Sequence, residues 1–102
     1  MTIYLVRLFK PNQYEISTFV DGSKESISVY KVTLRNNNYY CDCPGYWRQK
    51  VKEDHKHCRI VKFWIENLDM EMGYCFWLDN ENNIEYHKFI TKEIERYVLD
   101  NS

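Results

Sequence analysis

Five side chains that can bind a metal ion lie within eighteen residues of this 102-residue chain. They are Cys41, Cys43, His55, His57 and Cys58. Thiolate and imidazole are the ligands that suit tetrahedral zinc, and a structural zinc site needs four of them. A shared metal ion would require the two ends of the intervening segment to meet. This cluster therefore constrains the fold more than any other feature of the chain.

Five candidate ligands compete for four places, and the sequence leaves three sets open. Cys41 and Cys43 could be completed by His55 with His57, by His55 with Cys58, or by His57 with Cys58. His55 and Cys58 are three residues apart, so they would face the same side of a first helical turn. Without a metal ion, Cys58 would be a buried thiol that packs as a small apolar group. We favour zinc as the cofactor, and His55 with His57 as the second pair.

The first half of the chain predicts two β-hairpins and a helix. β-branched and aromatic residues dominate 3–9 and 13–20, with turn-forming residues between them. A longer strand over 27–34 is followed by an Asn-rich turn and a returning strand at 39–41. Residues 44–54 are expected to be a loop, and Asp54 a helix N-cap. The helix should begin near His55 and end near Leu68, because apolar residues recur at helical spacing.

The second half repeats this order of elements. Residues 74–78 and 84–89 are expected to form another hairpin, and 90–98 a final helix. We therefore predict a single α+β domain over 1–102, in which antiparallel hairpins pack against two helices. The repetition also raises the alternative of two consecutive ββα units, over 29–68 and 74–100.

Within residues 29–68 the chain resembles the SWIM-type zinc finger. That family has Cys-x-Cys at a hairpin end, a variable gap, and then Cys-x-His at the start of an apolar helix. Cys41-Asp42-Cys43-Pro44-Gly45 and the helix after His57 resemble this pattern, but His55 stands where the family has its second cysteine. The resemblance implies a structural zinc ion and binding of DNA or protein without catalysis.

The positive charge of the chain is concentrated around the cluster, although the formal net charge is only −1. Residues 44–62 have six basic and two acidic side chains, whereas 63–102 have three basic and nine acidic ones. Basic groups interleaved with aromatic rings are typical of nucleic-acid-binding surfaces. The alternative is a solvated loop, with Trp47 folded over the metal site. The candidate nucleic-acid-binding residues are Trp47, Arg48, Lys50, Lys52, Lys56, Arg59 and Lys62.

These features favour a small, non-enzymatic, zinc-stabilised binding module whose partner is nucleic acid or protein. The sequence has no Gly-rich phosphate loop, and a closed zinc site offers no position for a reacting water. The main alternative is an adaptor that binds a peptide at a sheet edge or between the two ββα units, with or without zinc. We expect an intracellular protein without a membrane span, because no export signal or long apolar run is seen. The acidic and basic halves could also pair in a homo-oligomer, and the Asn- and Lys-rich composition is typical of AT-rich genomes, including viral ones.

Overall fold

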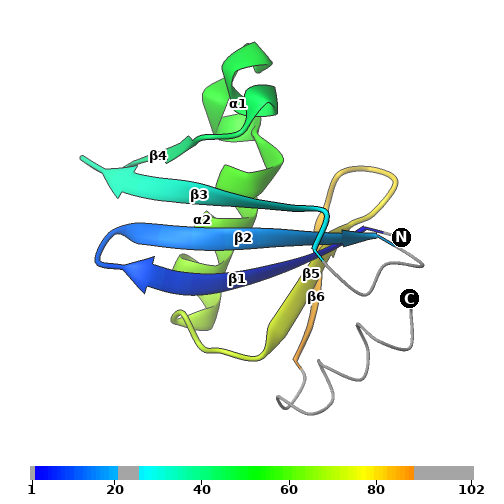
Figure 1. Ribbon diagram of the computed structural model, residues 1–102. Coiled ribbons are helices and arrows are strands. Elements are labelled where there is room, and N and C mark those ends of the chain that lie inside the picture. Colours follow the sequence, from blue (N-terminus) through cyan, green and yellow to red (C-terminus); the bar gives the residue numbers. More distant parts are fainter. Residues whose placement is uncertain (1, 21–25, 89–102) are drawn as a thin grey trace.

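The computed structural model describes residues 2–20 and 26–88, which form a six-stranded antiparallel sheet with one long helix across one face (Figure 1). The strand order is β4-β3-β2-β1-β5-β6. The strands are β1 (Thr2–Lys10), β2 (Gln13–Val20), β3 (Ser28–Arg35), β4 (Asn38–Cys41), β5 (Tyr74–Leu78) and β6 (Ile84–Lys88). Between β4 and β5 lie α1 (Pro44–Arg48), the 3₁₀ turn η1 (Lys52–Asp54) and α2 (Lys56–Leu68).

Alternation along the strands places apolar side chains on the face that α2 covers. Tyr4 and Val6 of β1, Tyr14 and Ile16 of β2, and Val32 of β3 are all buried. Successive side chains of a strand point to opposite faces, so these residues share one side of the sheet. They form one hydrophobic core together with residues of α2. The period-two pattern in the sequence therefore sets which face of the sheet receives the helix.

Asparagine residues close the hairpins. Asn12, Asn36, Asn37 and Asn82 all have positive φ angles, between 50° and 64°. Asparagine adopts this left-handed region more readily than other residues with a Cβ, and two-residue hairpin turns require it. The turn between β3 and β4 consists of Asn36 and Asn37, and it fixes the register that brings Cys41 opposite Val32. The Asn-rich turns thus help to position the first metal-ligand candidate.

The helix α2 presents a broad buried face, and its end is well defined. Ile60, Val61 and Trp64 are almost fully buried in the core. After Leu68 the chain turns at Asp69, whose φ is 51°, and the Trp64 indole N–H donates to the carbonyl of Glu71 at 2.8 Å. The predicted helix over residues 55–68 is therefore confirmed to within one residue.

The α+β class and all three predicted hairpins are confirmed, and the hairpins share one sheet. Strand β5 pairs with β1 in an antiparallel register that aligns Tyr4 with Phe76 and Leu5 with Cys75. The second half of the chain thus extends the sheet of the first half. The predicted helix over 90–98 lies outside the described residues.

Two local predictions for residues 44–54 are wrong. This segment is not a simple loop, because it contains α1 and η1. Pro44 occupies the first turn of α1, where its fixed φ is favourable and its missing N–H costs nothing. Asp54 is not the N-cap of α2. That position belongs to His55, which has no side-chain capping bond because its ring is directed into the cluster described below.

Candidate metal centre

Two segments of the chain bring four potential ligands to one point. Cys41 ends β4 and Cys43 is the N-cap of α1, while His55 precedes α2 and His57 lies in its first turn. Their ligand atoms all lie within 4.8 Å of one another. Cys43 Sγ is 3.0 Å from His55 Nε2, Cys41 Sγ is 3.4 Å from His57 Nδ1, and the two ring nitrogens are 3.2 Å apart. These four residues could therefore hold a metal ion.

Three spacings between ligand atoms are close to those of a tetrahedral site. With metal–sulfur bonds of about 2.3 Å and metal–nitrogen bonds of about 2.0 Å, neighbouring ligand atoms of a tetrahedron lie about 3.3 to 3.8 Å apart. The observed spacings of 3.0, 3.2 and 3.4 Å are close to this range. His55 would coordinate through Nε2 and His57 through Nδ1. Four ligand atoms converge on one small volume without any rearrangement of the backbone.

The cluster is buried, and its surroundings disfavour uncompensated charge. The four residues are only 2–4% exposed. Burial raises the pKa of the Cys41 thiol, lowers the pKa of His55, and lowers the pKa of His57 to about 3. A divalent cation with two thiolates and two neutral imidazoles has no net charge, so it suits such a site. Both the donor set and the burial fit a structural metal ion.

Asp42 fixes the two cysteines, a role that the sequence did not reveal. The backbone N–H of Lys31 donates to Asp42 Oδ1 at 2.9 Å, and the N–H of Asp42 donates to the carbonyl of Lys31 at 3.2 Å. This pair of bonds continues the pairing of β3 past the end of β4. It holds the Cys-x-Cys segment where both sulfurs can point at one centre. The only sequence indication was an acidic residue between two cysteines.

Replacing Asp42 with alanine should weaken metal binding although the side chain is exposed. The substitution removes the acceptor for the Lys31 N–H, and loss of residues that orient metal ligands typically lowers affinity by roughly 10–100-fold. We expect the metal affinity to fall by about 10-fold, near the lower end of this range. The hydrogen bond from the N–H of Asp42 to the carbonyl of Lys31 remains in the variant. Competition with a chromogenic chelator measures the affinity. Asp42→Asn keeps the acceptor oxygen and should bind metal like the original chain; equal losses in both variants would contradict the positioning role.

Aromatic rings hold the two imidazoles. Tyr30 stacks on His57 with ring centroids 5.6 Å apart, and Tyr4 meets the same ring edge-on at 5.8 Å. Tyr46 of α1 lies edge-on to His55 at 5.5 Å. Strands β1 and β3 therefore orient one histidine and α1 the other. These contacts explain why Tyr4 and Tyr46 are buried beside polar side chains.

Cys58 lies outside the group of four. Its buried Sγ donates to the carbonyl of Tyr39 at 3.7 Å, a weak contact, and burial raises its pKa to about 12. Its sulfur is directed at β4 and is not among the four ligand atoms that lie within 4.8 Å of one another. The structure thus assembles the set of four that the sequence favoured, and it does not assemble the two sets that contain Cys58.

The predicted nucleic-acid-binding residues lie on α1, η1 and α2 and on the short segment between α1 and η1. Trp47 is 71% exposed on α1, so it does not fold over the metal centre. Lys52 is partly committed, because its ammonium donates to the carbonyls of Tyr46 and Trp47 at 2.8 and 3.1 Å. Arg59 donates to the carbonyl of Asn82 at 2.7 Å. The other exposed members are Arg48, Lys50, Lys56 and Lys62.

Comparison of the chain with protein-family models, with curated proteins and with solved structures finds no match. In the part of the chain that the structure describes, no helix has the length and apolar character to cross a membrane. What is established is a zinc-finger-like cluster of two cysteines and two histidines, buried in a small α+β fold and capable of holding a metal ion.

Proposed function

We propose that this protein is a zinc-stabilised, non-catalytic module of SWIM-like type that binds nucleic acid. The observation that carries the proposal is that the four-ligand cluster lies at the start of the same helix that presents a row of basic side chains. Four protein ligands fill a tetrahedral zinc ion, so no position remains for a substrate or a reacting water. Zinc then stabilises the binding surface and takes no part in chemistry.

The basic side chains of α2 lie in a row. Lys56, Arg59 and Lys62 recur every third residue, which keeps them on neighbouring positions of the helix surface. None of the three forms an ion pair with any residue in 2–20 or 26–88. Cations without a carboxylate partner are free to neutralise phosphates and release counterions. Arg48 and Lys50, which closely follow the exposed Trp47 in sequence, add two exposed cations to the segment that leads into α2.

A salt titration tests nucleic-acid binding. We expect a short single-stranded or duplex oligonucleotide to bind, and the affinity to fall steeply as salt rises. Replacing Arg48, Lys50 and Lys56 together with glutamine should lower the affinity at least about 10-fold. The slope of log affinity against log salt concentration should become shallower by about two units, because each lost phosphate contact changes it by roughly 0.7–0.9. Fluorescence anisotropy of a labelled oligonucleotide measures both quantities.

Lys31→Gln is the matched control. It removes one positive charge from β3, where the side chain lies over the Phe9 ring on the face of the sheet opposite α2. This variant should change affinity less than about 2-fold. If the oligonucleotide bound weakly with an affinity independent of salt, and a peptide bound tightly, the result would instead support the adaptor function at a sheet edge.

A further inference from the structure

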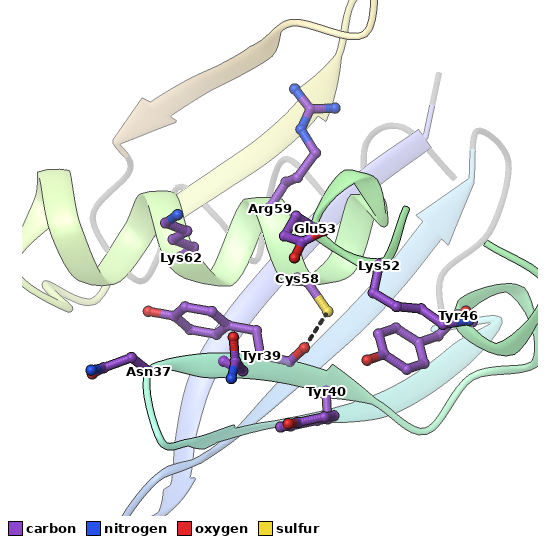
Figure 2. A pocket seen from close by; sticks show the side chains of 10 residues that line it. Asn37, Tyr39, Tyr40, Tyr46, Lys52, Glu53, Cys58, Arg59 and Lys62 are labelled. Carbon is purple, nitrogen blue, oxygen red and sulfur yellow. Dashed lines mark hydrogen bonds between the residues drawn. The ribbon is translucent and has the colours of Figure 1, made fainter. Parts of the chain in front are cut away.

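A cavity of about 370 Å³ opens beside the metal centre, between the strand β4 and the first turns of α2 (Figure 2). Tyr39 and Tyr46 lie on opposite sides of it, and Cys58 lies between them. The sulfur of Cys58 and the carbonyl of Tyr39 form part of its floor. The volume is within the range of cavities that hold small molecules, roughly 300–1,000 Å³.

The lining of this cavity combines aromatic, amide and cationic groups. Three basic side chains and one carboxylate, Glu53, line it, so its charge is positive. Lys52 and Arg59 are held by backbone carbonyls. Lys62 is the remaining basic side chain of the lining, and it makes no hydrogen bond or ion pair with a described residue. An anionic group of a ligand would therefore meet Lys62.

The Tyr39 ring supplies a surface for stacking. Its side chain is only half-buried, and Figure 2 shows it on the same side of the cavity as Lys62. Tyr46 is almost fully buried, so it closes the opposite wall. Asn37 and Asn38, at the turn between β3 and β4, line the same cavity and offer amide donors and acceptors. A planar ring with polar edges and an attached anion fits this arrangement.

We propose that the cavity holds one unpaired nucleotide of a single-stranded nucleic acid, with its base against Tyr39 and its phosphate at Lys62. This inference rests on the proposed function and specifies the form of nucleic acid that the surface selects. A base in a duplex is paired and stacked on its neighbours, so it cannot enter without being extruded at a cost of a few kcal/mol. An acidic side chain could pair with Lys62 but carries no flat ring for Tyr39, whereas a nucleotide carries the ring and the anion in one unit and so fits better.

Binding of a labelled single strand of about 12 nucleotides, compared with a duplex of equal length, tests the inference. The zinc-loaded full chain should prefer the single strand. Tyr39→Leu should weaken single-strand binding about 10-fold, because stacking of one base typically contributes that much affinity, and should leave duplex binding unchanged. Tyr39→Phe keeps the ring and should retain the affinity. Lys62→Gln, a surface change that should not disturb folding, is expected to weaken single-strand binding more than duplex binding.

The outcomes separate this inference from the proposed function. One outcome is that the protein binds the single strand and the duplex equally well, with no effect of Tyr39→Leu or Lys62→Gln. If the combined change at Arg48, Lys50 and Lys56 still weakened that binding, the nucleotide cavity alone would be overturned. Absence of salt-dependent binding to either form would overturn both. Tighter binding of a poly-glutamate peptide than of the single strand would assign the cavity to an acidic protein partner and reject the nucleotide. Metal content and melting of each variant show whether it is folded.

Discussion

Removing zinc with a chelator is expected to lower the melting temperature of this protein by at least about 12 °C. In peptides that contain a structural zinc site, zinc binds with an apparent free energy of roughly 10–16 kcal/mol. Ordering of the chain offsets part of this free energy. A domain of this size is stable by only about 5–15 kcal/mol. Even a net loss of about 3 kcal/mol would shift melting by the stated amount, since about 1 kcal/mol corresponds to 4–8 °C at this length.

The effect should extend beyond the four ligands. Metal removal releases the contact between the end of β4 and the start of α2, and α2 supplies Trp64, which is 1% exposed and meets Tyr14 of β2 edge-on at 6.1 Å. Loosening of α2 would expose this indole. Tryptophan fluorescence should therefore shift to longer wavelength together with the loss of stability, and Trp47, which is already exposed, should contribute little to the shift.

Metal analysis and readdition provide the controls. We expect about one zinc ion per chain, recovery of stability when zinc is restored, and no recovery with magnesium, which prefers oxygen ligands. Cobalt should replace zinc and give the absorption of a tetrahedral site with sulfur ligands. A zinc-free protein with the same melting temperature as the original sample would refute a structural role for the metal.

Local patterns made most of the fold predictable. β-branched and aromatic residues identified β1 and β2, alternation identified β3, and asparagine marked the hairpin turns because it adopts positive φ at low cost. Apolar spacing identified α2, whose buried residues recur on one face. These features depend on neighbours in sequence, so they can be read without the tertiary structure.

The rest depends on contacts between distant residues. The pairing of β5 with β1 joins Tyr4 to Phe76, far apart in the chain, and no local pattern specifies it. α1 is only five residues long and contains Gly45, so its helical tendency is weak and its formation relies on burial of Tyr46. The N-cap prediction failed for a related reason, because His55 is placed by the cluster and not by capping.

The metal site was predictable as a set of candidates but not as a unique set. Thiols and imidazoles in this spacing indicated a shared metal ion, whereas the choice between His57 and Cys58 depended on the direction of each side chain at the start of α2. His57 faces Cys41, and Cys58, one residue later, faces Tyr39 on β4. A rotation of about 100° per helical residue separates these neighbours, and an error of one residue in the helix start would exchange them.

The same substitution at two buried cysteines tests this assignment directly. Cys41→Ser should lower zinc affinity by more than about 100-fold and destabilise the fold, because losing a direct ligand should cost more than the roughly 10–100-fold lost with an outer-shell partner. Cys58→Ser should keep one zinc per chain and nearly the original affinity. Cys41 and Cys58 are 2% and 3% exposed, so the two changes bury a hydroxyl equally well and differ chiefly in the metal contact.

A histidine variant completes the comparison. His57→Gln keeps a polar side chain of similar size but removes the imidazole. Tyr30 and Tyr4 would still enclose this side chain. We expect the loss of zinc affinity to be similar to that of Cys41→Ser. Zinc affinity measured by chelator competition, with melting of the zinc-loaded samples, distinguishes the possibilities. If Cys58→Ser lost zinc and His57→Gln retained it, the thiol of Cys58 would be the fourth ligand. The start of α2 would then have to turn by about one residue to exchange the two side chains, which would also remove the sulfur of Cys58 from the floor of the cavity beside Tyr39.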